Sequence, residues 1–69
     1  MTVRDDILAE VSKCPRSFSW LEAKCSRPNL PEGHVMRIVA ELVNSHALMV
    51  QEWRYEDGIL QPVYARVGA

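Results

Sequence analysis

The sequence has little of what marks the more specialised classes of protein. Its 69 residues include only two cysteines, three glycines and one phenylalanine. No apolar run approaches the about 20 residues that a membrane-spanning helix needs, and no charged-then-apolar leader is visible. Two cysteines, Cys14 and Cys25, do not build a disulfide framework. We therefore expect no membrane span, no secretion signal, and free thiols in a reducing cytoplasm.

An excess of charge of one sign is also missing. Eight basic residues stand against nine acidic ones, which gives a formal net charge of −1. Dedicated nucleic-acid binders tend to be basic, because neutralised phosphates and released counterions supply much of their affinity. Any contact of this chain with nucleic acid must therefore rest on a local basic patch.

Residues that hold metals or attack substrates are few and poorly spaced. The zinc-type ligands are Cys14, Cys25, His34 and His46. They form no pair with the short spacing of zinc sites, and Cys25 is expected to be a small buried hydrophobe. The glycines stand too far apart for a phosphate-binding loop. We expect no enzyme, no metal and no cofactor.

The 48% of hydrophobic residues is typical of a folded globular chain. We expect a single small domain over residues 1–69, and a chain of this length buries about 60% of its unfolded surface. The first helix is predicted over Val3–Lys13, with Thr2 as its N-cap and Pro15 just beyond its end. The second is predicted from about Trp20 to about Ser26, behind a Ser19-x-x-Glu22 capping box.

A third helix is predicted to begin at Pro31 and to end near Ser45–His46. Five apolar residues recur on one face of it: Val35, Ile38, Val39, Leu42 and Val43. We expect this face to pack against four residues of the first two helices: Ile7, Leu8, Val11 and Leu21. Asparagine and histidine tolerate the left-handed backbone that a helix end often needs, so His46 suits that position.

Beyond the third helix the residues alternate between two faces with a period of two, which is typical of β-strands. Asp57-Gly58 predicts a two-residue hairpin turn that pairs Trp53 with Pro62. The predicted outward face carries Met49, Trp53, Tyr55, Leu60, Pro62 and Tyr64. The predicted inward face carries Leu48, Val50, Val63, Ala65 and Val67.

This order of elements, from Val3 to Val67, resembles the winged helix-turn-helix family. The stretch Leu42-Val43-Asn44-Ser45-His46-Ala47-Leu48 stands where that family often has Leu-Val-x-x-Gly-Leu-Val, with His46 in place of the glycine. The resemblance implies an α+β fold, in which a three-helix helix-turn-helix core is followed by a two-stranded β-hairpin wing. It also implies a small cytoplasmic DNA-binding regulator, of the kind that bacteria and their phages carry.

In DNA-reading members of the family, the outer face of the third helix enters the major groove. The outward positions here are Gly33, Met36, Arg37, Ala40, Glu41 and Asn44. Arg37 is expected to reach a guanine edge or a phosphate. The full set of residues that the resemblance places at duplex DNA is Lys24, Arg27, Gly33, His34, Arg37, Asn44 and Arg54.

The alternative is a protein-interaction module of the same fold that does not touch DNA. Met36 and Ala40 are apolar although they lie on the face of the third helix that is expected to be exposed to solvent. Four acidic residues on nearby surfaces would be repelled by phosphate: Glu41, Glu52, Glu56 and Asp57. A second copy or another protein is expected to bind the outward hairpin residues Met49, Trp53, Tyr55, Leu60 and Tyr64. The remaining possibility is a twisted ribbon in which Trp53 covers Pro62 and Tyr64 folds back on the N-terminal segment.

Overall fold

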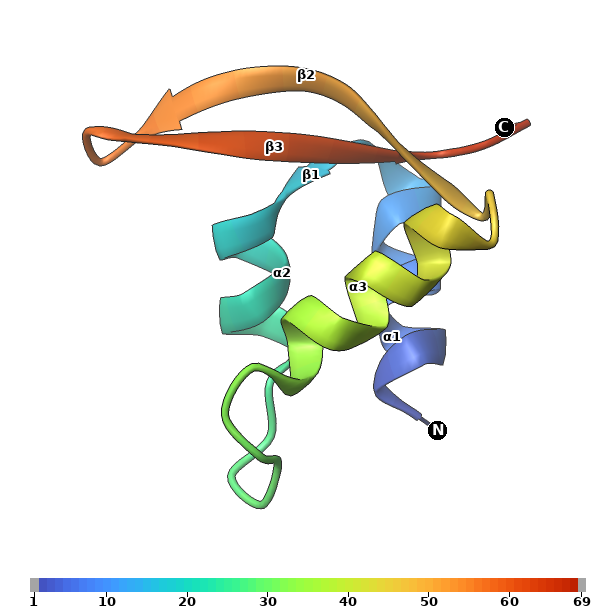
Figure 1. Cartoon of the computed structure of the whole chain (residues 1–69), viewed down its shortest axis with the longest axis vertical. Coiled ribbons are helices and arrows are strands. Elements are labelled where there is room, and N and C mark those ends of the chain that lie inside the picture. The colour runs from blue at the N-terminus through green and yellow to red at the C-terminus, as the bar shows by residue number, and fades with distance from the viewer. Residues whose placement is uncertain (1, 69) are drawn as a thin grey trace.

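A computed structural model describes residues 2–68 as an α+β fold of three helices and a three-stranded antiparallel sheet. The elements in chain order are α1 (Val3–Lys13), β1 (Arg16–Ser17), α2 (Phe18–Cys25), α3 (His34–Asn44), β2 (Leu48–Glu56) and β3 (Ile59–Arg66). The sheet lies across one side of the helices, and the tip of the β2–β3 hairpin projects beyond α2 (Figure 1). The predicted bounds of α1 are confirmed, and Thr2 caps it by accepting the Asp5 amide hydrogen.

The sheet has three strands and not the two that were predicted. The extra strand is β1, whose Arg16 and Ser17 lie opposite Tyr64 and Val63 of the central strand β3. Two residues are too few to show an alternating pattern in sequence. Because β1 ends beside Val63, Pro62 lies just past it, at a point of β3 where a missing N–H breaks no ladder bond.

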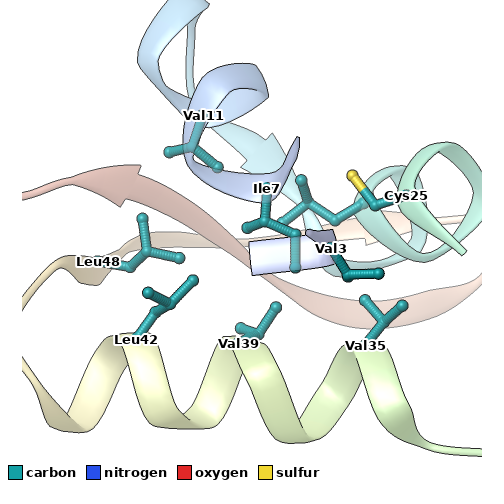
Figure 2. Packing of buried hydrophobic residues seen from close by; sticks show 9 residues of the cluster. Val3, Ile7, Val11, Cys25, Val35, Val39, Leu42 and Leu48 are labelled. Carbon is teal, nitrogen blue, oxygen red and sulfur yellow. The ribbon is translucent and has the colours of Figure 1, made fainter. Parts of the chain in front are cut away.

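The predicted packing of the third helix is confirmed. Val35, Val39 and Leu42 are buried on one face of α3 and point toward α1 and the base of β2 (Figure 2). The buried cluster that they share also contains Val3, Ile7, Val11, Leu21, Cys25 and Leu48. Leu8 and Ile38 pack against its margin. Apolar faces from all three helices therefore meet in one core, on which the sheet rests.

Helix α2 begins at Phe18, two residues before its predicted start. Ser17 and not Ser19 is its N-cap, because the Ser17 hydroxyl accepts the Trp20 amide hydrogen at 3.3 Å. The Ser19 amide instead donates to the side-chain oxygen of Gln61 on β3, at 2.8 Å. The capping box predicted from Ser19 and Glu22 is therefore wrong, since pairing of Ser17 in the sheet starts the helix two residues earlier.

Removing the Ser17 hydroxyl is expected to destabilise the fold, whereas removing that of Ser19 is not. Ser17→Ala should lower the free energy of unfolding by about 0.5–2 kcal/mol, the usual cost of losing an N-cap oxygen. Ser19→Ala should change it by less than about 0.5 kcal/mol, because the Ser19 side chain is exposed. Urea unfolding of both variants measures the difference, and a larger loss for Ser19→Ala would restore the capping box.

Helix α3 begins at His34, three residues later than predicted. Residues 31–33 form a turn instead, in which the His34 amide donates to the Pro31 carbonyl at 3.2 Å. Gly33 is the N-cap of α3 and has a φ of 78°, a left-handed value that suits glycine. The predicted end of the helix is confirmed: His46 has a φ of 64°. The amides of His46 and Ala47 bond back to the carbonyls of Val43 and Leu42, which is the Schellman pattern.

The predicted hairpin turn is confirmed, because Asp57 and Gly58 both have positive φ and Trp53 lies opposite Pro62. The predicted division of the hairpin into two faces is wrong at its base. The register shifts at Gln51 as a β-bulge does, which places Val50 opposite Tyr64 and Met49 opposite Ala65. Val50 and Val67 were both predicted to point inward. Val50 is exposed because of the register shift, and Val67 is exposed just beyond the end of β3.

Candidate nucleic-acid interface

The outer face of α3 is the surface that the predicted DNA contacts centre on. The helix packs against α1, α2 and β2 through its buried face, while the opposite face is open to solvent. The exposed residues there are Met36, Arg37, Ala40, Glu41 and Asn44. Met36 is 59% exposed, so this face is apolar as well as polar. Asn44 lies seven positions after Arg37, which corresponds to about two turns or 10 Å along the helix.

The entrance to α3 adds Gly33 and His34 to this face. No side chain caps the first turn of α3, and a side chain at Gly33 would meet open space. Backbone amides at such a helix start suit a phosphate oxygen. His34 is half-buried and lines a shallow hollow beside α2 together with the acidic residues Glu22 and Glu32. Those carboxylates reduce the attraction of the hollow for an anion.

Two of the predicted basic contacts are engaged in ion pairs within the chain. Arg27, in the loop after α2, is paired with Asp6 of α1. Arg54 on β2 is paired with Glu52 two residues earlier on the same strand face, with 2.7 Å between nitrogen and oxygen. All four side chains remain partly exposed to solvent. Both arginines therefore carry a compensated charge in the free protein.

Among the predicted lysine and arginine contacts, Lys24 and Arg37 have no such partner within residues 2–68. They do not lie together, because Lys24 borders a second hollow with Asp6 and Glu10, between α1 and α2. A hydrogen bond from Lys13 lowers the pKa of Glu10, so this carboxylate stays charged beside Lys24. The structure thus brings Gly33, His34 and Arg37 together on α3, and it places Lys24 and Arg27 toward α1.

The outward residues of the hairpin form a second exposed surface. Trp53 is 61% and Tyr55 72% exposed, and Leu60 lies opposite Tyr55 on the neighbouring strand. Val50, at 37% exposed, joins them because of the register shift, and Ile59 is exposed close to the turn. We name Val50, Trp53, Tyr55 and Leu60 the hairpin patch. Sequence reasoning missed Val50, since nothing in the pattern marks the bulge, and it assigned Ile59 to neither face.

Two other predicted interface residues differ from the hairpin patch. Met49 is exposed but lies opposite Ala65, away from Tyr64. Tyr64 is half-buried and packs against the core, and burial raises the pKa of its hydroxyl. Arg16, which lies opposite Tyr64 in the sheet, stacks over the Trp20 ring at 3.9 Å. At the base of the hairpin Tyr64 therefore belongs to the folded core, whereas Met49 and Val50 remain exposed.

The remaining reactive groups are isolated from one another. Cys14 is exposed and Cys25 is buried, and burial raises the pKa of the Cys25 thiol, which keeps it protonated. Within residues 2–68, no three histidine, cysteine or acidic side chains gather as metal ligands would.

No helix in the described part of the chain is both long enough and apolar enough to cross a membrane.

No family model matches the chain, and no curated protein matches it.

Proposed function

We propose that the chain is a winged helix-turn-helix domain that binds duplex DNA and acts as a small cytoplasmic regulator. One feature supports the fold: α3 runs directly into a projecting hairpin. The loop of eight residues between α2 and α3 departs from the motif, whose helices are commonly joined by a turn of about three to four residues. The short strand β1, between the first two helices, closes the sheet on β3. In this arrangement α3 is the recognition helix, and the β2–β3 hairpin is the wing.

The observation that carries the proposal is the open outer face of α3 with Arg37 on it. Arg37 is exposed and has no acidic partner within ion-pair distance among the described residues. An unpaired guanidinium on a helix that fits the major groove suits a guanine edge or a phosphate. Asn44 lies farther along the same face and is able to donate to a phosphate. Glu41, one turn from Arg37, opposes phosphate and so limits how the helix is placed.

The ion pairs of Arg27 and Arg54 are compatible with a role at DNA. Exposed ion pairs contribute only about 0–1 kcal/mol, so a phosphate is able to compete for either arginine. Opening the Arg54–Glu52 pair leaves a carboxylate near the DNA, however, and this offsets part of the gain. We therefore expect Arg54 to contribute less to binding than Arg37.

Binding of a fluorescent duplex at low salt tests the proposal directly. Arg37→Ala should weaken binding, and the slope of log affinity against log salt should become shallower by about one unit if Arg37 contacts a phosphate. Arg4→Ala is the matched control, because it removes the same charge from the exposed surface of α1. Equal losses for both variants would mean that only net charge matters. No binding by the wild-type protein at low salt would refute the proposal.

A protein-interaction module remains the second candidate, and the hairpin patch favours it. Trp and Tyr are the residues most enriched at interaction hot spots, and here Trp53 and Tyr55 are both largely exposed. If the protein binds no duplex, then the patch is its functional surface. Trp53→Ala should in that case abolish association with a protein partner and leave the fold unchanged.

A further inference from the structure

Strand β2 has one free edge. The sheet order is β1-β3-β2, so within residues 2–68 the nine-residue strand β2 is paired on the β3 side only. Its residues from Met49 to Tyr55 are all exposed, which shows that no loop or helix covers that edge. The strand also lacks lysine and proline, the residues that commonly protect free edges from pairing.

The hairpin turn determines which backbone groups face this free edge. A two-residue turn makes Glu56–Ile59 a hydrogen-bonded pair, and the pairs then alternate along the ladder. Arg54–Gln61 is hydrogen-bonded and Trp53–Pro62 is not, which agrees with the missing N–H of proline. The N–H and C=O groups of Trp53 and Tyr55 therefore point away from β3, toward the free edge.

The charges on β2 are complementary to those of a second copy of β2 that runs antiparallel to it. Glu52 and Arg54 flank Trp53 on both sides and point to the same face of the strand. When two copies of β2 run antiparallel with Trp53 opposite Trp53, each Glu52 lies opposite Arg54 of the second copy. Such directly opposed pairs have Cβ atoms about 4.5–5.5 Å apart, within reach of an ion pair.

We propose that two copies of this chain associate by antiparallel pairing of their β2 edges about a two-fold axis at Trp53. The pairing joins two three-stranded sheets into one sheet of six strands. The free N–H and C=O groups of Trp53 bond to those of Trp53 in the second copy. The two indoles then lie side by side on the axis, and Tyr55 of each copy lies opposite Gln51 of the other. This inference does not depend on DNA binding.

Other symmetric registers are less favourable. Centring the axis on Glu52 or on Arg54 places like charges opposite each other. Centring it on Tyr55 places Arg54 opposite Glu56, but the ladder then reaches Asp57, whose positive φ belongs to the turn. Only the axis at Trp53 places unlike charges opposite each other and also keeps residues 50–56 of each copy within the paired strands. The bulge at Gln51 then lies near each end of the paired stretch.

The test uses two variants with opposite charge, Glu52→Arg and Arg54→Glu. Each variant alone places like charges opposite each other across the axis, so each should sediment as a monomer of about the 7.9 kDa chain mass. An equimolar mixture should form a heterodimer, because every opposed pair is then unlike again. The wild-type protein should form a dimer across the same concentration series. Unchanged far-ultraviolet circular dichroism confirms that both variants remain folded.

Two controls make the result specific to this edge and register. Glu41→Arg changes the charge by the same amount on the open face of α3, and it should leave the dimer intact. Trp53→Ala should weaken the dimer. The proposal is overturned if the wild-type chain stays monomeric throughout, or if Glu52→Arg dimerises as the wild type does. Failure of the two charge variants to associate on mixing would also overturn it.

Discussion

Replacement of Leu42 by alanine is expected to lower the free energy of unfolding by about 2–5 kcal/mol. Leu42 is almost completely buried on α3 and lies beside Leu48 in the core (Figure 2). Removing its branched end leaves a cavity where the end of α3 meets the base of β2. Small domains have little stability in reserve, so this loss is enough to unfold a large fraction of the molecules.

Thermal and urea unfolding followed by circular dichroism measure this effect. Met36→Ala is the matched control, because Met36 lies on the same helix and points to solvent. It should change stability by less than about 0.5 kcal/mol. A melting temperature of Leu42→Ala equal to that of the wild type would show that α3 does not bury this face.

The second large effect is expected at Gln61. This side chain is buried, and its oxygen accepts the Ser19 amide hydrogen in the first turn of α2. Gln61→Leu keeps the volume but removes the acceptor, so the amide loses its partner. The expected loss is about 1–3 kcal/mol, the cost of an unsatisfied buried polar group. Gln51→Leu, at an exposed position of β2, should have little effect in the same urea titration. Similar losses for the two variants would mean that the bond to Ser19 contributes nothing.

Local signals in the sequence predicted those parts of the fold that depend on neighbouring residues. The bounds of α1 follow from Thr2 and Pro15, and the turn at Asp57-Gly58 sets the register of the hairpin next to it. The end of α3 at His46 follows from the same kind of local preference. Each of these features is determined within a few residues of the chain.

The incorrect predictions arise from contacts between distant residues. The Ser19 amide is taken by Gln61, 42 positions away, while Ser17 caps α2 because it pairs with β3. Nothing near Ser17 in sequence indicates that pairing. The bulge at Gln51 has no residue signature either, so the exposure of Val50 was not predictable from an alternating pattern.

The exposure of the candidate site residues was predictable from the sequence, but the ion pairs that some of them form were not. Arg37 lies on the outer face of α3 as the helical period indicates. The pairing of Arg27 with Asp6 joins residues 21 positions apart, across α1 and the loop after α2, so spacing gave no sign of it. The exposure of Trp53 and Tyr55 was predicted because the smaller residues of the hairpin were assigned to its inward face, and Val63, one of those residues, is indeed buried.

A titration of the isotope-labelled protein with duplex DNA at low salt, followed by amide NMR signals, tests the central claim most directly. We expect the signals of the open face of α3, from Gly33 to Asn44, to shift most, together with those near the hairpin turn. The indole signal of Trp53 should respond less than the amide of Arg37. Shifts confined to the hairpin patch, or no shifts at all, would contradict the assignment of α3 as a recognition helix.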